Sequence, residues 1–152
     1  MLQVGKRAPA FSLDNAEGER VSLKDFAGKT VVLYFYPRDN TPGCTLEAQD
    51  FQKALPEFKK RKAVVLGVSP DGGASHCKFR DKFGLSFPLL SDPEHAVLEK
   101  YGAWGEKTLY GKKSMGVLRS TVIIDKAGNV QKVFPKVKVN GHVDAVLAAL
   151  DE

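Results

Sequence analysis

Apolar residues recur along the chain with two different spacings, and these spacings predict its secondary structure. Two runs, 31–36 and 63–68, contain almost no polar residue, which is typical of central strands that are covered on both faces. Between them, apolar positions that step by four and three predict a helix from about 42 to 60, interrupted or kinked at Pro56. Two such strands joined by one helix form a βαβ unit, so we expect the strands to be parallel neighbours.

Shorter elements are predicted on either side of this unit. We expect an N-terminal hairpin of strands 10–13 and 20–23 and a second hairpin of strands 121–124 and 130–134. Between the hairpins the pattern predicts a helix at 74–83, a short strand at 87–90 and a helix at 93–101, and a terminal helix follows at 143–150. The segment 102–116 is rich in glycine and lysine, which predicts a long surface loop. Residues 1–152 are therefore predicted to form a single α/β domain, with one mixed sheet and helices on both faces.

Composition narrows the class of protein without revealing its chemistry. Hydrophobic residues make up 43% and charged residues 27% of the 152 positions, which is ordinary for a globular domain. The chain shows neither a run near the roughly 20 apolar residues of a membrane span nor a signal-peptide core, so we expect a cytoplasmic protein without a membrane partner. The net charge of +5 is spread along the chain, which favours a solvated surface over nucleic-acid binding. No metal or cofactor is expected, since the histidines lack ligand spacing with a cysteine cluster: His76, His95 and His142.

The segment Thr41-Pro42-Gly43-Cys44 follows the first buried strand and opens the long helix. Thr41 suits the N-cap and Pro42 the first helical position. Cys44 falls in the first turn, where unpartnered N–H groups and the helix dipole favour an anion. Such positions lower a cysteine pKa from about 8.5 to roughly 3.5–7.5. The sequence therefore predicts a reactive thiolate, in preference to a cysteine that only fills space in the core.

The same helix shows what else such a site needs. Cys44 shares one helix face with apolar residues, so its sulfur is expected at the tip of the buried stripe formed by Ala48, Phe51, Leu55 and Phe58. Glu47 lies one turn on, where a carboxylate would repel a thiolate. We therefore predict that a cation from elsewhere completes the site. Arg38 is a candidate, although we expect it to lie outside the pocket.

The stretch from Tyr36 to Glu47, YPRDNTPGCTLE, resembles the active-site signature of the peroxiredoxins. It is most similar to the peroxiredoxin Q, or bacterioferritin comigratory protein, subfamily. The similarity covers nearly the whole chain and continues in order through 6–13, 68–71, 87–92, 104–107, 110–113 and 119–125. It implies a thioredoxin-like fold and a thiol-dependent peroxidase for hydrogen peroxide and organic hydroperoxides, without metal, haem or flavin.

The resemblance also implies roles for individual residues. Cys44 would be the peroxidatic cysteine, which peroxide oxidises to a sulfenic acid. Arg119 matches the active-site arginine of the family and would steady the thiolate and pair with Glu47. The hydroxyl of Thr41 would donate to the thiolate or to the peroxide, and Pro37 would wall the pocket and limit water access.

The second cysteine departs from one common pattern of the subfamily. Many members carry a resolving cysteine five residues after the reactive one, where this chain has Gln49. Another branch places it in the following helix, and Cys77 matches that position. Because Phe79 and Phe83 are expected to face the core, Cys77 should lie on a side or outward face, and a disulfide would require local unwinding. The resemblance implies intramolecular resolution by Cys77 and recycling by thioredoxin, and we expect a monomer. The alternative is a spectator Cys77 and an external resolving thiol.

Two other functions stay open at this point. A thioredoxin-like disulfide oxidoreductase without peroxidase activity would use the same fold. That chemistry usually needs Cys-x-x-Cys, however, whereas Thr41 and Glu47 stand three residues from Cys44. A basic binding module without enzymatic activity would instead retain nucleic acid in a salt-dependent way, whatever residue stands at position 44.

Overall fold

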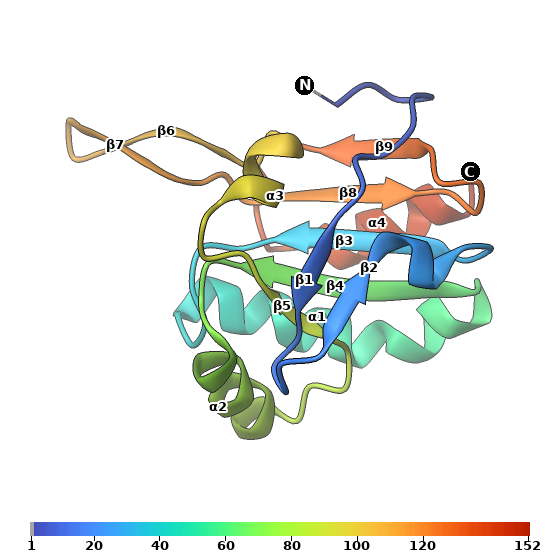
Figure 1. The fold of residues 1–152 in the computed structure, drawn as a ribbon, viewed down its shortest axis with the longest axis horizontal. Coiled ribbons are helices and arrows are strands. Elements are labelled where there is room, and N and C mark those ends of the chain that lie inside the picture. Colours follow the sequence, from blue (N-terminus) through green and yellow to red (C-terminus); the bar gives the residue numbers. More distant parts are fainter. Residues whose placement is uncertain (1) are drawn as a thin grey trace.

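Residues 2–152 are described by a computed structural model, drawn as a ribbon in Figure 1. Seven strands form one mixed sheet in the order β2-β1-β5-β4-β3-β8-β9. These strands are β1 Ser12–Asp14, β2 Arg20–Ser22, β3 Thr30–Phe35, β4 Ala63–Ser69, β5 Leu89–Ser91, β8 Ser120–Ile124 and β9 Val130–Phe134. The helices are the 3-10 helix η1 Leu23–Phe26 and the α-helices α1 Pro42–Lys60, α2 Gly73–Phe83, α3 Ala96–Lys100 and α4 His142–Leu150. No helix within residues 2–152 is long and apolar enough to cross a lipid bilayer.

The predicted βαβ unit forms the centre of the sheet. β3 runs parallel to β4, with Leu33 opposite Leu66, and α1 connects the two strands. On its other side β3 pairs antiparallel with β8, and Phe35 stands opposite Ser120. The loop that follows β3 and the residue before β8, Arg119, therefore meet at one edge of the sheet. This register positions the candidate site.

Hydrophobic cores lie on both faces of the sheet. Because side chains alternate along a strand, Val31, Leu33 and Phe35 enter one core, while Val32 and Tyr34 enter the other. Residues of α3 and the N-terminal segment complete the first core, and residues of α1, α2 and α4 complete the second. The predicted mixed sheet with helices on both faces is confirmed.

Both predicted hairpins of the main sheet are present. β1 pairs antiparallel with β2, and it also contacts β5 through Asp14 and Ser91, which joins the N-terminal hairpin to the sheet. β8 pairs antiparallel with β9, with Thr121 opposite Phe134. The helix predicted at 74–83 is α2, and it ends at Gly84, whose φ of 63° is the left-handed value that glycine adopts readily.

The segment 102–116, predicted to be a loop, is a β-ribbon instead. β6 Trp104–Leu109 and β7 Lys112–Val117 pair antiparallel over their whole length and project from the body of the molecule (Figure 1). Between them Tyr110 and Gly111 both have positive φ, 51° and 79°, as a two-residue type I′ turn requires. Glycine and lysine are poor strand formers, and here turn geometry and cross-strand hydrogen bonds outweigh that preference.

Smaller differences concern element ends. α1 continues through Pro56 to Lys60, so the helix is not interrupted there, and the kink offered as the alternative stays a prediction. α3 is shorter than the predicted 93–101, because His95 directly before it has a left-handed φ of 66°. The short strand predicted at 87–90 lies slightly later, at Leu89–Ser91.

Candidate active site

Cys44 lies at the start of α1, beyond the end of β3. Thr41 is the N-cap with an extended backbone, and Pro42 is the first helical residue. The Cys44 side chain is only 2% exposed and packs in the core beneath α1 with Ala48 and Phe51, as the apolar stripe predicted. The first-turn N–H groups and the helix dipole make this a favourable position for negative charge.

Arg119 brings a cation to this helix end. Its Nη2 lies 3.2 Å from Cys44 Sγ, and its Nη1 lies 2.5 Å from Glu47 Oε1, so one guanidinium contacts both groups. The pairing of Phe35 with Ser120 fixes the position of the Arg119 backbone beside the end of β3. The guanidinium lies close beside the first turn of α1: a Cβ on Gly43 would be in ordinary van der Waals contact with Nη2, at 3.4 Å.

Glu47 is fully buried beside Cys44 and Arg119. Burial raises the pKa of Glu47 to about 7, although Arg119 acts in the opposite direction. Its Oε1 accepts from Arg119, and its Oε2 has no hydrogen-bond partner among the residues that the structure describes. Burial opposes the charge of Arg119 as well, but Glu47 and Cys44 outweigh it and raise the pKa of Arg119. The guanidinium therefore stays charged between two groups that can be anionic.

Thr41 stands at the predicted N-cap but does not act as expected. Its Oγ1 donates to the carbonyl oxygen of Arg38 at 2.8 Å, and its side chain makes no capping hydrogen bond. Asn40, with φ of 61°, turns the chain between these two residues. The hydroxyl proton thus points to the Arg38 carbonyl and not to the sulfur, whereas the hydroxyl lone pairs can still accept.

Two other predicted residues flank this loop. Arg38 is exposed, as expected for a cation outside the pocket, and Pro37 is half-buried after the fully buried Tyr36. Arg119, and not Arg38, therefore contacts the sulfur.

Cys77 lies on α2, and its sulfur contacts the turn after β1. It is half-buried, and its Sγ donates to the carbonyl oxygen of Ala16 at 3.2 Å, in the turn after β1. Cys44 instead contacts Arg119 beside β8. In the sheet order β5, β4 and β3 stand between β1 and β8, so the two sulfurs contact different parts of the molecule. Both cysteines are free thiols in this structure.

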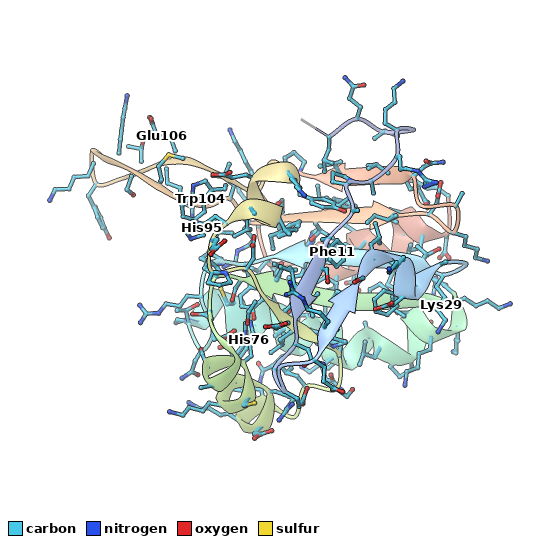
Figure 2. All side chains as sticks on the ribbon, in the orientation of Figure 1. Phe11, Lys29, His76, His95, Trp104 and Glu106 are labelled. Atoms are coloured by element: carbon cyan, nitrogen blue, oxygen red, sulfur yellow. The ribbon has the colours of Figure 1, made fainter. Side chains whose placement is uncertain are left out.

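The β6–β7 ribbon brings Lys107, which the sequence analysis did not single out, toward the site. Lys107 is half-buried, and burial lowers its pKa, as does Arg119, while Cys44 acts in the opposite direction. Its ammonium group therefore lies within the electrostatic field of the site. Figure 2 shows Trp104 near the base of the ribbon and Glu106 farther out. The Tyr110-Gly111 turn was the sequence signal that could have revealed this ribbon.

The histidines occupy three separate environments. His95 stacks on Trp104 with ring centroids 3.7 Å apart (Figure 2), and His76 is fully buried on α2. His142 Nε2 lies 2.8 Å from Thr121 Oγ1 in the core. Within the described part of the chain, no group of three or more His, Cys, Asp or Glu residues could hold a metal ion.

The chain is similar to known proteins over nearly its whole length. Residues 4–133 match the AhpC/TSA family. A Helicobacter pylori protein that carries the name peroxiredoxin bcp is 51% identical over 149 residues, which cover 98% of each chain. Peroxiredoxin Bcp of Bacillus subtilis is 46% identical over 151 residues, 99% of this chain and 96% of that protein. Among solved structures, the bacterioferritin comigratory protein of Xanthomonas campestris, studied for its alkyl peroxide reduction activity, is similar with a TM-score of 0.91 and 43% identity, covering 98% of both chains.

His142, in the core near the site, gives the stability a testable pH dependence. Burial lowers the pKa of His142 from 6.5 to about 4, and Arg119 adds to the effect. Between these values the unfolded chain binds more protons than the folded one. The free energy of unfolding should therefore fall as pH decreases through this window, by up to roughly 3 kcal/mol.

The raised pKa of Glu47 acts in the opposite direction over a similar range, so the wild type alone is not diagnostic. Urea unfolding of the wild type and of His142→Asn, each at pH 7 and pH 4.5, isolates the histidine contribution. We expect the variant to lose less stability on acidification. An equal loss in both proteins would contradict the assignment.

Proposed function

Because this chain belongs to the AhpC/TSA family and is a thiol-dependent peroxidase of the peroxiredoxin type, we propose that Cys44 is its peroxidatic cysteine. The observation that carries the proposal is the contact of Arg119 with Cys44 Sγ at the start of α1. The charged guanidinium and the helix N-terminus favour negative charge at the sulfur, and burial shields the sulfur from bulk water.

In the first step the Cys44 thiolate attacks the terminal oxygen of a peroxide ROOH. The S–O bond forms as the O–O bond breaks, Cys44 becomes a sulfenic acid, and the departing alkoxide takes up a proton to leave as ROH. Arg119 and the first-turn N–H groups stabilise the charge that moves from sulfur to oxygen. The Thr41 oxygen, whose proton is engaged by Arg38, accepts a hydrogen bond from the peroxide, and Pro37 limits the entry of water.

In the second step the Cys77 thiol condenses with the sulfenic acid, which forms the disulfide and releases water. α2 must leave its position first, because Cys77 Sγ contacts the Ala16 carbonyl whereas Cys44 Sγ contacts Arg119, and a disulfide needs the two sulfurs in contact. A thioredoxin-type dithiol then reduces the disulfide by thiol exchange and is itself oxidised.

The proposal also covers the peroxide substrates, the oligomeric state and the cellular compartment of the enzyme. The Xanthomonas campestris relative was studied for alkyl peroxide reduction, which supports organic hydroperoxides beside hydrogen peroxide as substrates. We propose that residues 1–152 act as one domain and as a cytoplasmic monomer, where thiol reductants keep both cysteines reduced between turnovers. The alternative of a disulfide oxidoreductase lacks its usual second sulfur, since the positions three residues from Cys44 hold Thr41 and Glu47.

The peroxidatic assignment is tested by replacing one sulfur at a time. Cys44→Ser should abolish peroxide consumption, because the attacking atom is gone, while Cys77→Ser should still consume one equivalent in a single turnover. Peroxide loss with stopped-flow mixing and a thiol count measures both. Undiminished consumption by Cys44→Ser would refute the assignment, and insulin reduction without peroxide turnover in the wild type would favour the disulfide oxidoreductase.

The resolving assignment has its own test. After one equivalent of peroxide the wild type should be lighter by two hydrogen atoms and have no free thiol. Cys77→Ser should instead stall after one turnover with thioredoxin, and then overoxidise at Cys44. If Cys77→Ser cycles normally with thioredoxin, an external thiol resolves Cys44 and Cys77 is a bystander.

A further inference from the structure

A buried polar contact joins the loop before Cys44 to the helix that carries Cys77. His76, on α2, is fully buried, and Asp39, in the loop between β3 and α1, is 7% exposed. His76 Nδ1 lies 2.7 Å from Asp39 Oδ2. Figure 2 shows His76 between α2 and the sheet. Asp39 precedes Cys44 by five residues and His76 directly precedes Cys77, so this contact links the two cysteine-bearing segments.

The hydrogen-bond directions place one proton within the pair. His76 Nε2 lies 3.0 Å from the carbonyl oxygen of Leu90, which can only accept, so Nε2 carries a hydrogen. His76 Nδ1 and Asp39 Oδ2 then share one further proton across 2.7 Å. Whichever atom holds that proton, the pair is buried and neutral overall. Separating the two side chains would leave at least one buried polar group without a partner, which is costly.

Other groups hold Asp39 in place for this contact. Tyr36 donates its hydroxyl to Oδ1 at 2.6 Å, and Ser75 donates its hydroxyl to Oδ2 at 2.8 Å. The backbone N–H of Asp39 donates to Asp71 Oδ2 at 2.7 Å. Asp39 is therefore anchored by the residue that follows β3, by the loop before α2 and by α2 itself. α2 cannot move away without breaking the bonds of Ser75 and His76 to Asp39.

We propose that His76 and Asp39 are positioning residues for the resolving step: their contact holds α2 against the loop, and its release frees Cys77 to reach Cys44. This role rests on the proposed function of Cys77 as the resolving cysteine. The other polar contacts of α2 with the N-terminal hairpin, Arg80 with Glu17 and Cys77 with Ala16, are on its solvent-accessible side. The His76–Asp39 contact is buried, as is the contact of His76 with Leu90, and it is the one that joins α2 to the loop before Cys44. Its strength therefore contributes to how often α2 opens.

The frequency of opening decides between two fates of the oxidised sulfur. If α2 opens quickly, the Cys77 thiol condenses with the sulfenic acid and water leaves. If α2 stays closed, the sulfenate takes an oxygen atom from a second peroxide, which is reduced to ROH, and becomes a sulfinate. The strength of the His76–Asp39 contact thus influences the peroxide concentration at which the enzyme overoxidises.

Cys77 itself reports on opening. In a Cys44→Ser background it is the sole thiol, and its labelling by an aromatic disulfide reagent under native conditions measures how often α2 opens. His76→Asn should accelerate labelling about ten- to a hundredfold, as expected when buried polar groups lose the partners that the imidazole supplies. Lys78→Ala, on the exposed face of the same helix, is the matched control and should change nothing. Urea unfolding of each variant confirms that it remains folded.

Two further variants separate a specific contact from general loosening. Asp39→Asn should accelerate labelling similarly, and combining it with His76→Asn should add little, because both remove one interaction. If His76→Asn fails to fold, Ser75→Ala removes a single hydrogen bond to Asp39 and should still accelerate labelling about threefold or more. Labelling within twofold of Lys78→Ala in all these variants, or fully multiplicative effects in the double variant, would overturn the proposal.

The catalytic consequence is measured with Cys44 present. His76→Asn should show a smaller sulfinate fraction than the wild type at the same peroxide concentration, by mass spectrometry, and an equal or larger fraction would overturn the role in resolution. Failure of the proposed function looks different: the wild type would form no Cys44–Cys77 disulfide although His76→Asn still accelerated labelling. That result would exclude Cys77 as the resolving cysteine, but it would still show that the His76–Asp39 contact keeps α2 closed.

Discussion

The candidate site depends on one guanidinium that contacts two acidic groups at once. Arg119 reaches Cys44 Sγ with one nitrogen and Glu47 with the other, at the start of a helix whose dipole already favours an anion. A thiolate and a carboxylate this close would repel each other without a cation between them. Because the fork of Arg119 is planar and always charged, it positions both groups and counters the repulsion between them.

Burying these charged groups costs free energy, and the surrounding fold holds them in place. Glu47 is fully buried, one of its oxygens has no hydrogen-bond partner within residues 2–152, and burial raises its pKa to about 7. The register of β3 with β8 holds Arg119 at the end of the sheet where α1 begins. Packing of Ala48 and Phe51 in the core under α1 keeps the sulfur buried. The β3–β8 register and the packing of α1 therefore leave the guanidinium little freedom. This offsets the free-energy cost of burying the Glu47 carboxylate.

The chemistry of the first turn was predictable because it is local. A proline, a glycine and a cysteine in helix-opening register, followed by an apolar stripe, specify where Cys44 lies. Arg119 is 75 residues away in the chain, and only the resemblance to the peroxiredoxins pointed to it, since strand register cannot be inferred from composition. The direction of the Thr41 hydroxyl was missed because it depends on the turn at Asn40.

Two longer-range features of the structure were not predicted from the sequence, for similar reasons. The β6–β7 ribbon, which brings Lys107 toward the site, was hidden by glycine and lysine content, although the Tyr110-Gly111 turn carried a signal. The contact of Asp39 with His76 joins a loop to a helix across 37 positions of the chain, and in the sequence each residue is an ordinary polar side chain. Local patterns thus identified the nucleophile, whereas the groups that act on it come from tertiary structure.

The central claim, that Arg119 enables the reaction of Cys44 with peroxide, is tested by rapid-mixing kinetics on Arg119→Met. With hydrogen peroxide its second-order rate constant should fall roughly a hundredfold or more below that of the wild type. Arg119→Lys, which keeps a charge but loses the fork, should fall between the two. A rate constant for Arg119→Met within about threefold of the wild type would contradict the account, because the guanidinium would then be stabilising neither the attacking sulfur nor the departing oxygen.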